Sequence, residues 1–384
     1  MTTKRDIENA LMRGADTLRD TIDAANYKDY VLPMMFVKYL SDSYREEVEK
    51  LEKQYTGIRL ERQKKYLPFT VAEDHSFHSL YEQRYADNIG QLINIAMRQI
   101  EADNNQQLAG VLSAVDYNSE NALGTREHKN ALLRDLLEDF EPLDLRPSMI
   151  EVKEGQIPAD VIGDAYEYMI GQFASMAGKK AGSFYTPAAV SEIMARIVDV
   201  QPGDRVYDPT CGSGSLLIKT AKRQSSSEVS IYGQEVNGSS VAMAKMNMYI
   251  HEIRDAKIGW GDTLANPVFL DSDGNLLLFD AIVANMPFSK DKWASGFNPG
   301  GESSGKGKKE FKMEPSLDKF HRFDWGVPPS SKGDWAFLLH MIASLSVKGR
   351  IAAVAPHGVL FRGSAEGRIR QKVVEENLLD AVIG

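Results

Sequence analysis

Cysteine is nearly absent from this chain, which has 1 in 384 residues. A single cysteine excludes an internal disulfide and fits a reducing compartment, so we expect a cytoplasmic protein. Apolar runs of membrane-spanning length are absent too, and the opening residues 1–6 lack the apolar core of a signal peptide. We therefore expect no membrane contact.

Excess positive charge is also missing. The chain carries 45 Lys and Arg against 54 Asp and Glu, a formal net charge of −9. This balance argues against a protein that grips DNA by itself through bulk charge. The 7 histidines show no metal-ligand spacing, so no metal site is expected. The length leaves room for two or three domains, and a hydrophobic content of 43% supports a sizeable core.

The dinucleotide fingerprint G-x-G-x-x-G is absent, and a different glycine turn follows the apolar segment 205–208. Gly212 and Gly214 would let the backbone approach a ligand closely. Asp208, at the end of the expected strand, would repel a phosphate but suits a cationic amino group. The pattern predicts a strand, a tight turn and a helix start that hold a ligand without a pyrophosphate.

Two more acids follow expected strands. Glu235 ends the segment 229–235, roughly 20 residues beyond the glycine turn, where nucleotide-type folds hold ribose hydroxyls. Asp262 follows the segment 258–261 and suits an adenine amino group. A sulfonium, an ammonium and a ribose without phosphate describe S-adenosyl-L-methionine, which we expect as the cofactor.

An apolar run, residues 280–284, ends in Asn285-Met286-Pro287-Phe288. The side-chain oxygen of Asn285 and the backbone carbonyl of Met286 can accept the two N–H bonds of a planar amine and free its lone pair. Pro287 fixes φ and helps to aim that carbonyl, and Phe288 offers a face for base stacking. Taken alone, this motif is also an ordinary turn after a strand.

The remaining sequence indicates an α/β fold behind a helical domain. Residues 1–155 show helical spacing, including a buried helix from Tyr30 that continues over 41–54 as a charged surface helix. The proline-containing stretch 142–158 makes a boundary. From 156 to 384, strand-like and helical segments alternate, which is typical of a doubly wound, mostly parallel sheet. The acids and Asn285 all fall at expected strand ends, where such sheets bind ligands.

These motifs, with Gly182–Pro187 before the glycine turn, resemble the modification subunits of type I restriction-modification systems, which are amino-methylating DNA methyltransferases. The resemblance runs from about residue 162 to the end and includes Lys332–Phe337 and Pro356–Gly363. It implies that the glycine turn holds the cofactor's amino acid, Glu235 its ribose and Asp262 its adenine. The other cofactor-contacting residues that it implies are Ser183, Phe184, Tyr185, Thr186, Pro187, Ser213 and Ser215.

The resemblance also implies an assembly. The chain would methylate adenine N6 in double-stranded DNA beside a specificity subunit, a restriction subunit with nuclease and translocase functions, and a second copy of itself. In that family residues like 1–155 form a helical partner-contacting domain. Residues 377–384 look like the start of a further strand, so we expect the chain to be a fragment or to lack the last part of its catalytic domain.

One departure from the family keeps alternatives open. Met286 replaces the first proline of the usual pair, which leaves its carbonyl but removes stiffness, so a slowed enzyme or a catalytically lapsed scaffold is an alternative. Another is methylation of a different planar amine: cytosine N4, an RNA base or a glutamine side chain. Cys211 sits inside the glycine turn as a small residue, which argues against a cytosine C5 nucleophile.

Within the stretch 290–333, residues 295–310 are rich in Gly, Ser and Lys, and we expect residues from about 294 to 312 to form a mobile loop beside the catalytic motif. Lys306, Lys308 and Lys309 would contact DNA phosphates if this loop covers an extruded base. The alternative is a solvated surface insertion.

Overall fold

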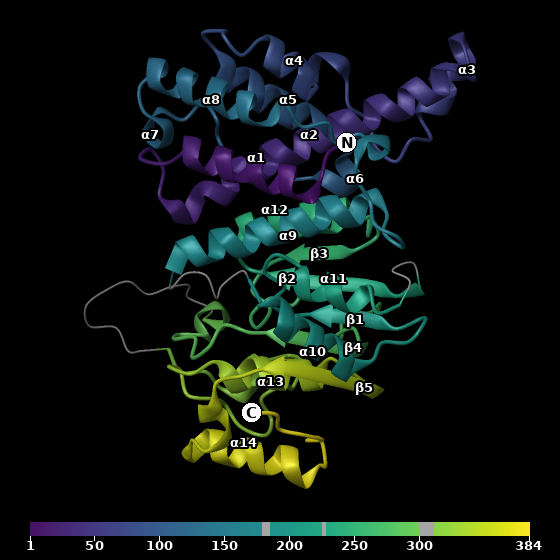
Figure 1. Cartoon of the computed structure of the whole chain (residues 1–384). Helices are drawn as coiled ribbons and strands as arrows, with labels where there is room; N and C mark the ends of the chain where they lie inside the picture. The colour runs from purple at the N-terminus through teal and green to yellow at the C-terminus, as the bar shows by residue number, and fades with distance from the viewer. Residues whose placement is uncertain (179–184, 225–227, 299–310) are drawn as a thin grey trace. The chain divides into compact units, whose positions relative to one another are not determined.

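The structure is a computed structural model that describes residues 1–178, 185–224, 228–298 and 311–384 (Figure 1). The chain separates into two compact units. The first comprises residues 1–185 and 242–254, and the second comprises residues 186–241 and 255–384. Each unit has its own hydrophobic core.

The first unit is helical, as the sequence predicts. Its first helix starts with a capping box: the Thr3 hydroxyl accepts the Asp6 N–H, and the Asp6 carboxylate accepts the Thr3 N–H. Its helices are α1 (Lys4–Thr17), α2 (Tyr27–Glu52), α3 (Gly57–Lys64), α4 (Phe77–Glu82), α5 (Ile89–Asp103), α6 (Asn105–Leu108), α7 (Glu120–Leu123), α8 (Arg126–Phe140), α9 (Pro158–Ala177) and the end of α12 (Gly238–Ile250).

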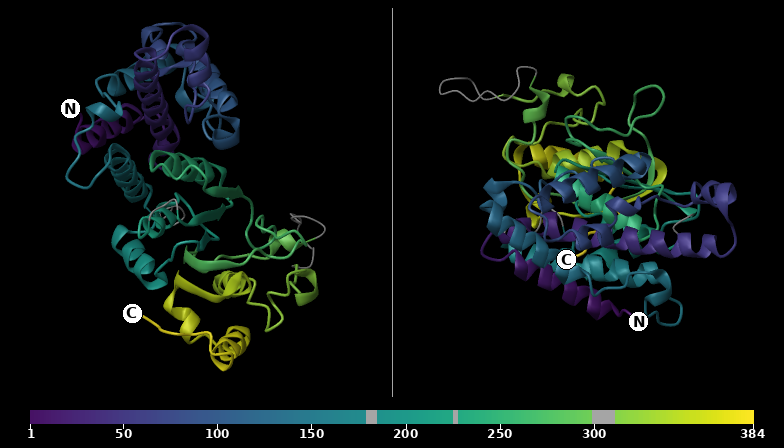
Figure 2. Two further views of the ribbon diagram at one scale, coloured as in Figure 1. Left: turned by 90° about the vertical axis from the view of Figure 1, so that its right-hand side faces the viewer. Right: turned by 90° about the horizontal axis from the view of Figure 1, so that it is seen from above.

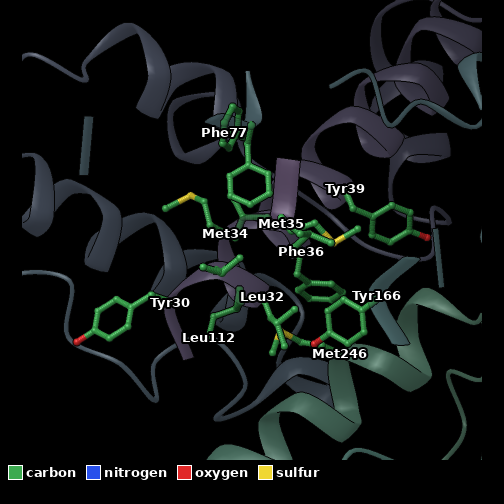
Figure 3. Close-up of a cluster of buried hydrophobic side chains, with 14 of the residues drawn as sticks. Tyr30, Leu32, Met34, Met35, Phe36, Tyr39, Phe77, Leu112, Tyr166 and Met246 are labelled. Carbon is green, nitrogen blue, oxygen red and sulfur yellow. The ribbon is translucent and has the colours of Figure 1, made fainter. Parts of the chain in front are cut away.

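The core of the first unit is built around α2, whose middle is buried on all sides. Figure 3 shows large side chains of this helix meeting side chains from the helices around it. Tyr117 donates its hydroxyl to the Tyr30 carbonyl at 2.8 Å, which satisfies a polar group inside this core. Side chains drawn there include Leu32, Met34, Phe36, Phe77, Leu112, Tyr166 and Met246.

The expectation of a surface helix over 41–54 is wrong for its first half. Asp42 and Glu46 are buried. The Asp42 carboxylate pairs with Lys38 and accepts the Leu145 N–H at 2.7 Å, while Glu46 accepts the Ser148 N–H at 3.1 Å. These acids face inward because they hold the backbone of the connector that follows α8, which helical periodicity alone does not reveal.

The second unit contains a five-stranded parallel sheet in the order β3-β2-β1-β4-β5 (Figure 1). This confirms the predicted doubly wound fold. The order reverses direction between β1 and β4, and sheets of this kind bind ligands beyond the carboxyl ends of the strands at such a reversal. The strands are β1 (Arg205–Asp208), β2 (Ser230–Glu235), β3 (Lys257–Trp260), β4 (Phe279–Asn285) and β5 (Leu345–Val354).

Helices cover this sheet and close its core. α10 (Ala188–Val198) and α11 (Ser215–Ala221) pack on each other and on the central strands. α13 (Asp334–Ala343) and α14 (Ser364–Glu375) join the cluster that contains Tyr207 and Phe279, whose rings stack at 4.3 Å between centroids. Figure 1 labels α13, α14 and β5 in the yellow-green to yellow part of the chain, which the left view of Figure 2 shows from the side. Strand alternation places side chains on both faces of the sheet.

The strand expected near residues 377–384 does not form. Leu378 donates its N–H to the Val373 carbonyl at 3.0 Å, and the residues after it take no regular structure. An apolar segment becomes a strand only where a neighbouring edge pairs with it. Within the described parts of the chain, no helix is long and apolar enough to cross a membrane.

Candidate functional site

The candidate site lies at the carboxyl ends of the parallel strands, all within the second unit. β1 ends at Asp208, β2 at Glu235 and β4 at Asn285, while Asp262 follows β3 by two residues. β1 lies between β2 and β4, so Asp208 and Asn285 flank the point where the strand order reverses. The structure thus brings together the acids and the amide that the sequence places at strand ends.

The glycine turn between β1 and α11 adopts a left-handed path. Gly212 has φ +52° and Gly214 has φ +77°, a region that other residues enter at a steric cost. The Gly214 N–H donates to the Cys211 carbonyl at 2.7 Å and closes the turn. Ser213 and Ser215 are buried with their hydroxyls 3.0 Å apart. The glycines are therefore needed for the turn itself.

Asp208 is buried at the root of this turn, with 2% of its surface exposed. Its Oδ1 accepts the Thr210 N–H at 2.9 Å. Burial, together with the neighbouring Glu235 charge, raises the pKa of Asp208 to about 8. A cationic group next to Asp208 would offset this cost, so the site is suited to an ammonium ligand.

Glu235 joins the second strand to the glycine turn. Its Oε2 accepts the Gly212 N–H at 3.1 Å, and its Oε1 accepts the Asn237 N–H at 2.8 Å. Burial raises the pKa of Glu235, while these backbone bonds and the Lys290 charge oppose the rise. Because a carboxylate offers about four acceptor sites, Glu235 retains capacity for ligand hydroxyls.

Asp262 shapes the turn after β3. Its Oδ1 accepts the N–H groups of Leu264 and Ala265 at 2.9 and 3.2 Å. The sequence pattern around Asp262 does not reveal these backbone contacts. The second carboxylate oxygen, Oδ2, remains available for a ligand amine in addition to the turn.

Cys211 packs against the sheet. An ideal Cβ on Gly233 would come within 2.9 Å of the Cys211 sulfur, so the thiol fills the space over that glycine. Burial raises the pKa of the Cys211 thiol well above its usual range. A buried neutral thiol is a poor nucleophile, which agrees with the structural reading of this residue.

At the end of β4, the side chain of Asn285 is oriented by a hydroxyl. Asn285 Nδ2 donates to Thr186 Oγ1 at 3.2 Å, which assigns the donor side of the amide to Thr186 and leaves Asn285 Oδ1 as the side-chain acceptor. Met286 is buried, with 1% of its surface exposed, whereas Phe288 is 51% exposed. The motif therefore presents an acceptor and an open aromatic face, while the Met286 side chain anchors the loop in the core.

The structure describes only part of the segment that precedes α10. Thr186 and Pro187 lie in the second unit, and the ring of Tyr185 packs against the helical core of the first unit. Ser183 and Phe184 lie outside the described residues, as do Lys306, Lys308 and Lys309. Among the residues that are described, no group of three or more His, Cys, Asp or Glu side chains is placed to hold a metal ion.

Sequence reasoning missed the residues that hold the backbone segments next to the site. Gln234 donates to the carbonyls of Gly261 and Asn266 and accepts the Val268 N–H, so it fixes the path after β3. Asp334 accepts the Ser289 N–H just beyond the Asn285 motif. The family-like segment around Asp334 was visible in the sequence, but nothing there gave its contact.

Two family profiles match the chain. The one described as N-6 DNA Methylase matches residues 158–384, and the one described as HsdM N-terminal domain matches residues 7–140. The type I restriction enzyme MpnII methylase subunit of Mycoplasma pneumoniae is 31% identical over 98% of this chain and 72% of the relative. The MjaIX methylase subunit of Methanocaldococcus jannaschii is 26% identical over 98% of this chain and 66% of the relative.

Solved structures agree with this assignment. The methyltransferase subunit of a type I restriction-modification system from Streptococcus thermophilus superposes with a TM-score of 0.76 at 31% identity, over 99% of this chain and 80% of that one. A modification subunit from Vibrio vulnificus shares the fold, with a TM-score of 0.60 at 19% identity over 97% and 75% of the chains. The expected resemblance is confirmed: the chain belongs to the N-6 DNA methylase family, among the methylase subunits of type I restriction enzymes.

Proposed function

We propose that this chain transfers a methyl group from S-adenosylmethionine to adenine N6 in double-stranded DNA, as the modification subunit of a type I restriction-modification complex. The observation that carries the proposal is the pairing of Asp208 and Asn285 at the point where the strand order reverses. One residue suits a cationic amino acid and the other suits a planar amine. Methyl donor and acceptor can thus meet in one crevice.

The residues present fit the cofactor. Asp208 would hold its ammonium, Glu235 its ribose hydroxyls and Asp262 its adenine amine, with the turn through Gly212 and Gly214 along its amino acid. The raised pKa of Asp208 supports this, because a buried acid without a cation is costly. When bound, S-adenosylmethionine supplies an electrophilic methyl group on its sulfonium.

The catalytic residues act on the acceptor amine. Asn285 Oδ1 and the Met286 carbonyl would accept the two N6 protons and concentrate the lone pair on nitrogen. Phe288, half exposed beside them, would stack on the base. An adenine inside a duplex cannot reach these groups, so it must be extruded at a cost of a few kcal/mol. The carbonyl of Met286 replaces that of proline without loss of the acceptor.

The chain depends in this proposal on partner subunits for DNA binding. With a net charge of −9, the chain would obtain its DNA affinity from a specificity subunit. We assign partner contacts to the helical residues 1–155 and catalysis to residues 156–384, and we propose a restriction subunit and a second copy as further partners in the cytoplasm.

The test is methyl transfer with product analysis. The chain with its specificity subunit is incubated with a target plasmid and labelled S-adenosylmethionine, and the nucleosides are separated. We expect N6-methyladenine from the wild type. Asn285→Ala should lower the rate by about 10²–10³ while binding the cofactor normally, because it removes one preorganised acceptor.

Three outcomes contradict the proposal. N4-methylcytosine as the product would move the activity to the other planar amine. If the wild type binds the cofactor but transfers no methyl group, the chain is a scaffold subunit without catalytic activity. A fully active Asn285→Ala variant would remove the assigned mechanism.

A further inference from the structure

The backbone that follows the Asn285 motif is held by a buried carboxylate. Asp334, at the start of α13, is fully buried. Its Oδ1 accepts the Ser289 N–H at 2.6 Å, and its Oδ2 accepts from Arg362 Nη2 at 2.5 Å. Burying a carboxylate is costly even when a guanidinium pairs with it. The burial of Asp334 therefore indicates that this carboxylate has a role at the loop it contacts, around Ser289.

The loop that Asp334 contacts contains a residue, Ser289, in an unfavourable backbone conformation. Ser289 has φ +51°, a left-handed conformation that a non-glycine residue keeps only when its surroundings enforce it. A second contact lies next to the first: the Gly333 N–H donates to the Lys290 carbonyl at 3.0 Å. An ideal Cβ on Gly333 would lie 3.0 Å from Trp293 Cβ, so the glycine permits this close approach. Two consecutive residues of the loop are therefore fixed through their backbone.

Arg362 is itself held in place. Its Nε lies 3.0 Å from Glu366 Oε2, and Glu366 is buried on α14. An ideal Cβ on Gly358 would come within 2.9 Å of Arg362 Nε, so the guanidinium crosses over a turn that only glycine leaves open. The contacts form a continuous path from Glu366 through Arg362 and Asp334 to the Ser289 N–H.

We infer that Asp334 and Arg362 are positioning residues that set the direction of the Met286 carbonyl and the Phe288 ring. Ser289 lies three residues after Met286, and Met286 lacks the fixed φ that a proline would give. We call Asp334 and Arg362, with their contacts to Ser289 and Glu366, the clamp. The clamp restores the stiffness that the family's proline pair supplies covalently. Neither residue touches the acceptor base, so their effect reaches the reaction through backbone geometry. This inference rests on the proposed methyl transfer.

The test compares variants of the clamp with a matched control. Asp334→Ala removes the acceptor of the Ser289 N–H, and Arg362→Lys keeps the charge but loses the shared contact with Glu366. Asp280→Ala is the control, because Asp280 braces the opposite end of the same strand: it accepts the Arg205 N–H at 3.0 Å and the Ser346 hydroxyl at 2.8 Å.

The first readout is single-turnover methylation by the complex with the specificity subunit. We expect Asp334→Ala to slow this step by about 10²-fold, as a misplacement of about 1 Å does, with the dissociation constant of S-adenosylmethionine changed less than about twofold. Arg362→Lys should lose less, and Asp280→Ala should keep the wild-type rate. If Asp334→Ala does not fold, Asp334→Asn replaces it: its amide oxygen still accepts the Ser289 N–H, but its NH2 group opposes Arg362, so we expect a loss of rate like that of Arg362→Lys and smaller than that of Asp334→Ala.

The second readout does not depend on activity. In the peptide that contains residues 286–293, the Ser289 amide should exchange slowly in the wild type and in Asp280→Ala, and fast in Asp334→Ala, because Asp334 accepts its N–H. Exchange at wild-type rate in the clamp variant overturns the inference even if the chain transfers no methyl group. Equal rate losses for Asp334→Ala and Asp280→Ala overturn it as well, because general loss of stability would then explain both. An inactive wild type with a protected loop refutes the proposed function and leaves the clamp as a structural brace only.

Discussion

At the residue scale, the site depends on how one amide is turned. The sequence predicts Asn285 as an acceptor but leaves open which side-chain atom faces the ligand. In the structure Asn285 Nδ2 donates to Thr186 Oγ1, so the oxygen is the amide atom turned away from Thr186. Thr186 was predicted from family resemblance as a cofactor contact, and we propose that it also orients Asn285. A contact between residues 99 positions apart cannot be read from either motif alone.

This role predicts a selective effect of Thr186→Val. Valine keeps the shape but cannot accept from Asn285, so the amide loses its orientation, worth about 0.5–1.5 kcal/mol for one hydrogen bond. We expect single-turnover methylation to slow by about 2- to 10-fold, with Thr186→Ser close to wild type. A valine variant that loses cofactor affinity but keeps its rate would return Thr186 to cofactor binding alone.

The buried carboxyl of Asp208 predicts a pH dependence of cofactor binding. Its pKa is about 8, so the free protein holds this group mostly protonated at pH 7. A bound ammonium favours the ionised form, so binding releases about one proton, and affinity rises as pH increases from about 6 to 8. Calorimetry in buffers of different ionisation enthalpy measures the number of protons that are released when the cofactor binds.

The control for this prediction is Asp208→Asn, which has no proton to release. Its affinity should be lower and nearly flat between about pH 6 and 8, since the remaining groups are unchanged. A wild type that binds with no proton exchange at pH 7 would place the ligand's cation elsewhere.

At the scale of elements, the sequence predicts the strands of the sheet well and their supports poorly. Strands ending at Asp208, Glu235 and Asn285 are where the apolar runs and acids placed them. Short apolar runs between turns and polar strand ends are local signals. The burial of Asp42 on α2 was missed because it depends on a backbone partner at Leu145, far along the chain.

A second support that local patterns do not reveal is the buried Arg322. Its guanidinium pairs with Asp318, with Nη2 2.8 Å from Oδ1, and donates to the carbonyls of Thr263 and Leu264 beside Asp262. It also donates to His340 Nδ1. Because arginine only donates, the neutral ring must carry its proton on Nε2 and donate to the Tyr207 hydroxyl. Burial and the Arg322 charge lower the pKa of His340, which agrees.

Arg322→Met should therefore destabilise the second unit strongly. It leaves Asp318 buried without its charged partner, although the backbone N–H of residue 322 still donates to it, for an expected loss of about 3–5 kcal/mol in the free energy of unfolding. The double variant with Asp318→Leu should recover much of this loss, because an apolar pair replaces the charges. Denaturant unfolding measures both variants, and equal losses in the single and double variants would contradict the ion-pair account.

At the scale of the whole molecule, charge decides how the chain meets DNA. A net charge of −9 gives no bulk attraction to phosphates, although the chain belongs to a family of DNA methylases. The sequence indicates this directly, because net charge needs no structure. It does not give the target sequence, since base readout depends on groove contacts that a separate subunit would make.

We therefore predict weak, sequence-independent DNA binding by this chain alone. Its dissociation constant for a short duplex should lie above about 10⁻⁶ M near physiological salt, in the range of non-specific binding. Adding the specificity subunit should tighten binding to one sequence and steepen the dependence on salt, because cations on that partner then neutralise phosphates. Fluorescence anisotropy over a salt series measures both quantities, with a scrambled duplex as the control. A footprint on one sequence without any added subunit would show that the chain reads DNA itself, and the division of labour between catalysis and recognition would then fail.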